Sequence, residues 1–159
     1  MAESRTIHHW LAAGFGSGWL PRAPGTWGSL TSLLPAWFLV EQSGALTLIA
    51  ASLMLLVLGC WNCSIVLPQL ADKDPGWIVI DEWVGQWLCL GVILIFLDSS
   101  FAHMAVAFIA FRGFDVFKPW PVSYVETLGP PWWSIMADDV VAGLMGATVV
   151  VVGSMALGG

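Results

Sequence analysis

Two long uncharged runs dominate the hydrophobic pattern of the chain. Gly44–Leu67 and Val140–Leu157 contain no Asp, Glu, Lys or Arg. The hydrocarbon core of a bilayer is about 30 Å thick, and a helix of about 20 apolar residues crosses it. Both runs are therefore predicted to form membrane-spanning helices.

Three shorter apolar runs reach spanning length only together with their flanks. Trp83–Leu97 has fifteen residues and becomes long enough when Ile78–Ile80 and the two acids that follow form its first turn. Phe101–Phe111 reaches spanning length only together with the polar residues that follow it. Thr26–Val40 contains Pro35, which predicts a kink, so this run is either a tilted span or a re-entrant piece.

The connections between these runs alternate between short and long. Glu41–Gly44 and Leu97–Ser100 are tight turns, whereas the N-terminal segment, Pro68–Val79 and Lys118–Ala137 are long. All basic residues lie on the side of the long connections: Arg5, Arg22, Lys73, Arg112 and Lys118. By the positive-inside rule this side is predicted to be cytoplasmic. The pattern as a whole predicts an all-α fold, a polytopic integral membrane helical bundle of about four to five spans, one of them short or re-entrant.

Composition supports this membrane assignment. The chain is 58% hydrophobic and 10% charged, compared with roughly 45–50% apolar residues in soluble domains. A soluble helical domain would have too few charged residues to cover its surface. The net charge of −6 and the lack of a basic stripe argue against nucleic-acid binding. The three cysteines predict no disulfide framework, and Cys60 and Cys63 are interpreted as small apolar helix residues.

Five acids lie at the edges of the apolar runs, all on the predicted cytoplasmic side: Asp81, Glu82, Asp115, Asp138 and Asp139. Single members of this group have simple structural explanations. Asp138 could cap the start of a helix, where the helix dipole favours negative charge. Asp115 could pair with Arg112 or Lys118, since each lies three residues away on the same helical face.

Together the five carboxylates predict a metal site. They come from three different helices, and uncompensated charge at membrane depth is costly. A divalent cation would offset their repulsion, and oxygen ligands favour Mg²⁺ or Mn²⁺ over zinc. The neighbouring Arg112 and Lys118 favour an anionic substrate, most simply a phosphate, whose charge the metal and the basic groups would stabilise.

A glycine-rich segment, Gly14–Leu30, leads into the first apolar run. Glycine permits close backbone approach to a ligand, and the N–H groups of a helix N-terminus bind anions. The segment has neither the P-loop spacing nor the Rossmann spacing. It is therefore either an anion-binding loop or an ordinary entry loop.

Four motifs, LPRAPGTWGSL, DPGWIVIDEWVGQW, FRGFDVFKPWPV and MADDVVAGL, together resemble the phosphatidylglycerophosphatase A family. The resemblance covers about residues 14–146, with the motifs in family order. It implies a Mg²⁺-dependent integral membrane enzyme that hydrolyses phosphatidylglycerophosphate to phosphatidylglycerol and inorganic phosphate. The expected location is the inner (plasma) membrane, with several spans and the active site facing the cytoplasm.

The resemblance also implies domain limits and residue roles. Residues 1–159 form a single membrane-embedded phosphatase domain, with 1–25 as the cytoplasmic N-terminal segment and phosphate loop and 26–157 as the helical bundle. The expected metal ligands are Asp81, Glu82, Asp115, Asp138 and Asp139. All of these except Asp138 are also expected to be catalytic. The expected phosphate-binding residues are Thr26, Gly28, Ser29, Arg112 and Lys118. The partner is a phospholipid in the membrane, while the oligomeric state, the number of metal ions and the roles of Asp72 and Asp74 stay open.

Two other functions also use clustered carboxylates. A carboxylate-lined ion or proton transport protein is the main alternative, since intramembrane acids build relays. Relay acids are expected at several depths, however, whereas these gather at one membrane face. A phosphotransferase of the CDP-alcohol type uses metal and clustered aspartates too, but its D-G-x-x-A-R signature is missing from the sequence.

Overall fold

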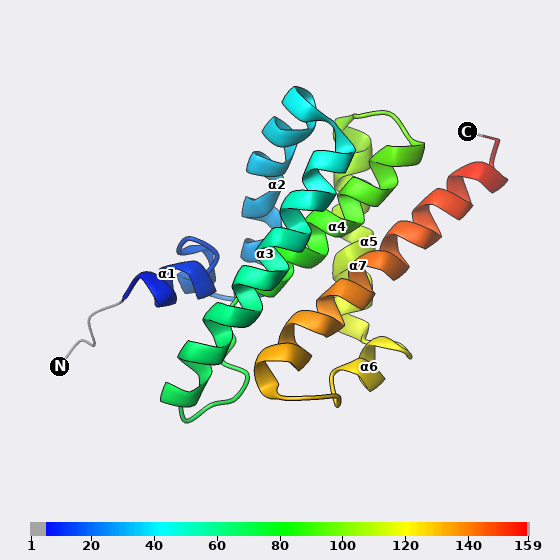
Figure 1. The fold of residues 1–159 in the computed structure, drawn as a ribbon. Coiled ribbons are helices and arrows are strands. Elements are labelled where there is room, and N and C mark those ends of the chain that lie inside the picture. Colours follow the sequence, from blue (N-terminus) through cyan, green and yellow to red (C-terminus); the bar gives the residue numbers. More distant parts are fainter. Residues whose placement is uncertain (1–5, 159) are drawn as a thin grey trace.

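The computed structural model describes residues 6–158, and within this range the chain is helical and has no strand, which confirms the all-α fold class. Arg5, assigned to the cytoplasmic side, lies outside the described residues. Five long helices form the bundle in Figure 1: α2 (Pro24–Ser43), α3 (Ala45–Val66), α4 (Ile80–Phe96), α5 (Phe101–Phe117) and α7 (Pro131–Ala156). The shorter elements are α1 (Ile7–Ala12), α6 (Val122–Val125) and the 3-10 turns η1 (Ser17–Trp19) and η2 (Leu67–Gln69).

Helix α4 lies at the centre of the bundle. It packs against α2, α3, α5 and α7, and most of its residues are buried, including Val84, Leu90 and Ile93. A helix that is apolar on all sides is expected in such a position. The two acids at its first turn, Asp81 and Glu82, are therefore carried into the middle of one end of the bundle.

Local sequence signals set the helix ends around this position. Pro24 and Pro131 open α2 and α7, where the missing proline N–H costs nothing. The Ser100 hydroxyl accepts the His103 N–H at 3.2 Å and caps α5. At the other end of α5, Lys118 takes a left-handed conformation with φ of 42° and precedes Pro119, which stops the helix. The Lys118 side chain thus projects from the point where the chain turns towards α7.

The N-terminal segment is tied to the start of α4. The Val79 N–H donates to the Ala12 carbonyl at 2.9 Å. The Asn62 amide donates to the His8 carbonyl at 2.9 Å, which fixes α1 against α3. Figure 1 shows α1 beside the bundle, at the end where α4 begins.

Two helices start earlier than the hydrophobic pattern predicts. Helix α7 begins at Pro131, not near Val140, so Asp138 lies inside the helix and the capping interpretation of that residue is wrong. Helix α2 runs without interruption over 20 residues and contains Pro35, so the short predicted run is extended at both ends. A proline inside a helix costs one backbone hydrogen bond but does not always end the helix.

Within residues 6–158, two helical segments are long and apolar enough to cross a membrane, by length and composition alone. They are Ala45–Gln69, with 25 residues, and Pro131–Ala156, with 26 residues. They contain almost all of the two uncharged runs in the sequence. Helices α4 and α5 have 17 residues each, which is at the lower limit of about 17 for spanning helices.

Candidate active site

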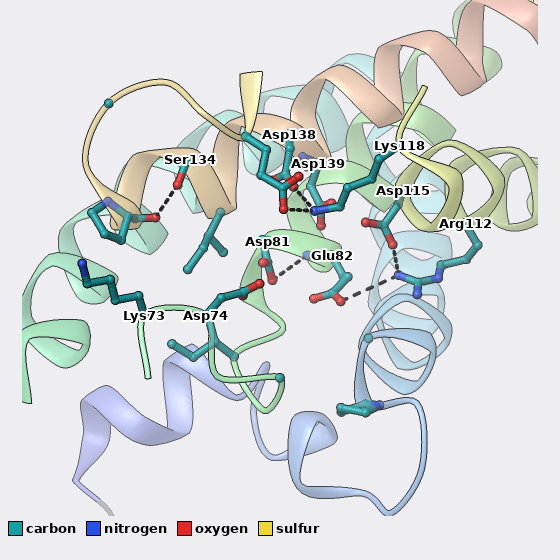
Figure 2. Close-up of a pocket in the computed structure, with 18 residues that line it drawn as sticks. Lys73, Asp74, Asp81, Glu82, Arg112, Asp115, Lys118, Ser134, Asp138 and Asp139 are labelled. Atoms are coloured by element: carbon teal, nitrogen blue, oxygen red, sulfur yellow. Dashed lines mark hydrogen bonds and ion pairs between the residues drawn. The ribbon is translucent and has the colours of Figure 1, made fainter. Parts of the chain in front are cut away.

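A cavity of about 490 Å³ opens at the end of the bundle where α4 begins and α5 ends. Its wall includes all five acids predicted from the sequence, and also Arg112 and Lys118. Figure 2 shows these side chains converging from α4, α5 and α7. The volume lies within the range of roughly 300–1,000 Å³ that is typical of small-molecule sites.

Three of the acids form a tight group, defined here as the carboxylate cluster: Asp81, Glu82 and Asp139. Each contributes one oxygen, and these oxygens lie within 4.8 Å of one another. Asp81 and Asp139 are only 8% and 3% exposed, and the Glu82 Oε2 atom is buried without a hydrogen-bond partner in the part of the chain that the structure describes. Several buried carboxylates so close together repel one another unless a cation compensates them. The unpartnered oxygen and the all-oxygen donor set therefore fit a hard divalent cation.

Two glycines allow the helices that carry the cluster to approach closely. A Cβ atom on Gly143 of α7 would lie 2.5 Å from the Gly85 carbonyl of α4. A Cβ atom on Gly85 would collide with the Phe111 ring and lie 2.7 Å from the Asp139 carbonyl. Small residues at helix contacts are typical of membrane bundles because they bring backbones together. Here they bring Asp139 beside the first turn of α4.

Arg112 links α5 to the carboxylate cluster. Its Nη1 atom forms an ion pair with Asp115, which confirms one of the two pairings that the helical spacing allowed. The same atom lies 3.7 Å from Glu82 Oε1. A Cβ atom on Gly25 would collide with Glu82 Oε1, so the glycine at the start of α2 lets this carboxylate and Arg112 approach the helix end.

Lys118 connects the end of α5 with α7. Its Nζ atom donates to Asp138 Oδ2 at 2.8 Å and to Glu126 Oε1 at 2.6 Å. Burial lowers the pKa of Lys118, but the hydrogen bonds and charges of Asp138 and Glu126 outweigh burial and raise the pKa above its ordinary value. Lys118 therefore remains a cation at neutral pH. Its ammonium group pairs with Glu126 and Asp138, so the pairing of Asp115 with Lys118 that the spacing also allowed does not form.

Three of the predicted phosphate-binding residues do not line the cavity: Thr26, Gly28 and Ser29. The Ser29 hydroxyl donates to the Gly25 carbonyl at 2.9 Å instead. Gly28 packs against Val79, and a Cβ atom there would lie 2.8 Å from the Val79 Cβ. From this loop, Pro24 and Gly25 reach the cavity wall.

The cavity also contains polar residues that the sequence did not assign: Lys73, Asp74, Glu126 and Ser134. The roles of Asp72 and Asp74 were left open, and of these two only Asp74 lines the cavity. Asp72 Oδ1 accepts the Asp74 N–H at 3.0 Å in the loop. Glu126 gave little signal in the sequence because it follows a short helix and stands alone. Its position eight residues after Lys118, across a turn that contains Pro119, is the one hint of the pairing.

Comparisons with known proteins match most of the chain to one family. A family model described as Phosphatidylglycerophosphatase A matches residues 10–154. A Haemophilus influenzae protein named Phosphatidylglycerophosphatase A is 36% identical over 142 residues, which cover 89% of this chain and 85% of the relative. The Escherichia coli protein of the same name is 33% identical over 141 residues, covering 89% and 80%.

A third relative has a different name. A Bacteroides thetaiotaomicron protein, provisionally named a phosphatidylinositol-3-phosphatase, is 32% identical over 152 residues, which cover 93% of this chain and 94% of the relative. No solved structure matches the chain at a significant level. The resemblance inferred from the four motifs is confirmed by the family match, and the chain belongs to the phosphatidylglycerophosphatase A family of enzymes.

Proposed function

We propose that this chain hydrolyses the terminal phosphate monoester of phosphatidylglycerophosphate and releases phosphatidylglycerol and inorganic phosphate at the cavity. The observation that carries the proposal is the carboxylate cluster, whose three oxygens lie within 4.8 Å of one another beside two cationic side chains. Both relatives named for this activity align with about nine-tenths of the chain. The ion or proton transport alternative has no comparable support.

Asp81, Glu82 and Asp139 would hold Mg²⁺ or Mn²⁺, and Asp138 and Asp115 would support the site from its edge. When bound, the metal would neutralise charge on the phosphoryl oxygens and make a coordinated water more acidic. The buried, unpartnered Glu82 Oε2 atom supports this ligand assignment, because a buried carboxylate oxygen normally has a partner. Mn²⁺ has the same preference for oxygen donors.

Arg112 and Lys118 would bind the phosphate oxygens and orient the phosphorus for attack by water. Asp115 lies beside the carboxylate cluster and is held by Arg112, so it is placed to accept a proton from the attacking water. The bond between phosphorus and the glycerol oxygen breaks, and this oxygen leaves as an alcohol by taking up the proton that Asp115 accepted from water, directly or through solvent. Thr26, Gly28 and Ser29 would not contact the phosphate. They would contribute only by positioning the backbone of Gly25, which lines the cavity.

The proposed setting is the inner membrane, crossed by α2, α3, α4, α5 and α7 with the cavity end in the cytoplasm. Large apolar side chains are exposed on every one of these helices, for example Leu34, Val57, Ile95, Ile109 and Val149. A lipid environment would cover them. Within residues 6–158, the basic residues Arg22, Lys73, Arg112 and Lys118 all belong to the cavity end, which favours the cytoplasmic side.

Metal dependence of phosphate release tests this function. Purified full-length protein in detergent or vesicles is assayed with phosphatidylglycerophosphate, and EDTA is expected to abolish release, with Mg²⁺ restoring it. Mg²⁺ is also expected to raise the Tm of the wild type, because a ligand that binds only the folded state stabilises it. The matched control is Asp81→Asn, whose Tm should not respond to Mg²⁺. Full phosphate release in EDTA would contradict the metal assignment.

A further inference from the structure

Lys73 is a cation of the cavity wall for which the proposed chemistry has no use. Within residues 6–158, three cationic side chains line the cavity, Lys73, Arg112 and Lys118. Arg112 and Lys118 are held in ion pairs with acids. Lys73 is exposed and, in the same described range, its ammonium group makes neither an ion pair nor a hydrogen bond. Of the three cavity cations in the described residues, Lys73 is therefore the one that no acid neutralises.

The position of Lys73 separates it from the other two cations. In Figure 2, Lys73 lies on one side of the carboxylate cluster, and Arg112 and Lys118 lie on the other. The neighbouring Asp74 side chain points towards Asp81, whereas Lys73 points away from the cluster, towards the first turn of α7. The cavity thus has two cationic sides with the reacting centre between them.

The substrate has the matching number of anionic groups. Phosphatidylglycerophosphate carries the phosphate monoester that is hydrolysed and, across a glycerol unit, a phosphodiester that stays with the lipid. Arg112 and Lys118 account for the monoester. A second phosphate that enters the same cavity needs its own cation, since an anion taken from water without a partner loses its solvation.

An apolar groove continues from the Lys73 side. The groove has a volume of about 300 Å³ and is lined by Leu67, Leu70 and Trp132, and it shares Lys73 and Pro131 with the cavity. The order along this path is carboxylate cluster, Lys73, then apolar wall. The order along the lipid is monoester, glycerol, phosphodiester, then diacylglycerol, so the two sequences of groups correspond.

We propose that Lys73 forms a second anion-binding subsite, which holds the retained phosphodiester of the substrate and directs the diacylglycerol part onto the Leu67–Trp132 groove. The inference rests on the proposed function. Its consequence is selectivity for lipids with two phosphates. Phosphatidic acid, which carries a monoester and no phosphodiester, gains nothing from Lys73, because its single phosphate occupies the reacting centre.

The test compares two lipids at equal mole fraction in mixed micelles. Lys73→Met removes the charge and keeps the length of the side chain, and Lys73→Arg keeps the charge. A hydrogen bond to a charged group is worth about a 10- to 100-fold change in binding. We expect Lys73→Met to lower kcat/KM for phosphatidylglycerophosphate by about this factor, to change that for phosphatidic acid by less than about twofold, and Lys73→Arg to restore the preference.

Product inhibition gives a readout that does not depend on the rate with phosphatidic acid. Phosphatidylglycerol retains the phosphodiester, so Lys73→Met is expected to weaken its inhibition about tenfold and to leave inhibition by inorganic phosphate unchanged. If inhibition by inorganic phosphate weakens instead, Lys73 holds the released phosphate and the proposal is overturned.

Two controls separate charge effects from the subsite. Arg22→Met removes an exposed cation that does not line the cavity and should affect both lipids equally. Lys118→Met should lower the rates for both lipids, since it acts on the shared monoester. Equal losses for both lipids in Lys73→Met would overturn the inference, while a wild type that releases no phosphate from phosphatidylglycerophosphate would instead overturn the proposed function.

Discussion

The two ends of the helical bundle carry acids in very different surroundings. At the cavity end, Asp81, Asp138 and Asp139 are buried between α4 and α7. At the other end, the Asp98 side chain is 78% exposed and lies 3.5 Å from the His103 ring, and Glu41 accepts a hydrogen bond from Ser99 at 2.9 Å. The exposed acids join helix ends, whereas the buried acids face a common cavity.

This difference shows that helix packing, not the presence of an acid at a helix end, makes the candidate site. Both ends have acids near the start or end of a helix, where backbone groups and the helix dipole can use them. Only at the cavity end do Gly85 and Gly143 bring two acid-bearing helices into contact. The carboxylate cluster exists because α4 and α7 cross at that level.

The largest expected effect on kcat comes from replacing one acid with asparagine at each end of the bundle. Asp81→Asn removes a proposed metal ligand and should lower kcat by about a thousandfold or more, since metal stabilisation of the transition state is worth several kcal/mol. Asp98→Asn, the matched change at the other end, should alter kcat by less than about twofold, because surface substitutions rarely perturb a protein. Initial rates of phosphate release for both variants, at equal amounts of membrane-inserted protein, measure this. Similar activities would remove the distinction between the two ends.

A smaller effect is expected from glycines on the same two helices. Gly85→Ala adds a methyl group against the Phe111 ring and the Asp139 carbonyl, and such overpacking costs about 1–3 kcal/mol of unfolding free energy. Gly153→Ala places its methyl group where, within residues 6–158, no heavy atom beyond its own helix turn lies within 4 Å, so its effect should stay below about 1 kcal/mol. Thermal unfolding and kcat are measured together. A Gly85→Ala protein with wild-type stability and activity would show that the close contact does not position the cluster.

The smallest effect is expected at Cys60, near the cavity end of α3 but outside the cavity wall. Cys60→Ser should change the unfolding free energy by about 1 kcal/mol or less and leave kcat within about twofold. The same assay of phosphate release gives the result. A strong loss of activity with intact folding would mean that the Cys60 thiol takes part in the reaction. A residue near the cavity but outside its wall would then also contribute to activity.

The length of the uncharged run predicted α3 almost to the residue, because no charged residue interrupts the chain from Gly44 to Leu67. It placed the start of α7 too late. The segment from Pro131 to Ala137 contains no long apolar run, yet Pro131 starts a helix there and later turns continue it. Predictions based on uncharged runs miss helical turns that lie beyond a pair of charged residues, here Asp138 and Asp139.

The candidate site was predictable in its acids and less so in its cations and loops. The acid pairs stand out in a chain with so few charged residues, and their helices were recognisable. Lys73 and Glu126 lie in connections whose paths depend on how the helices pack, and no local pattern encodes those paths. Thr26 and Ser29 matched a family motif, but neither lines the cavity, and the Ser29 hydroxyl donates to the Gly25 carbonyl within α2.

The hydrogen bond between Val79 and Ala12 has a practical consequence for engineering the protein. Through this bond, α1 fixes the chain segment immediately before α4. The first turn of α4 carries Asp81. An N-terminal truncation that removes α1 would therefore remove a contact that positions the start of α4, even though no α1 residue lines the cavity. A fluorescent reporter is better fused after the final helix, which ends at Ala156 at the opposite end of the bundle (Figure 1).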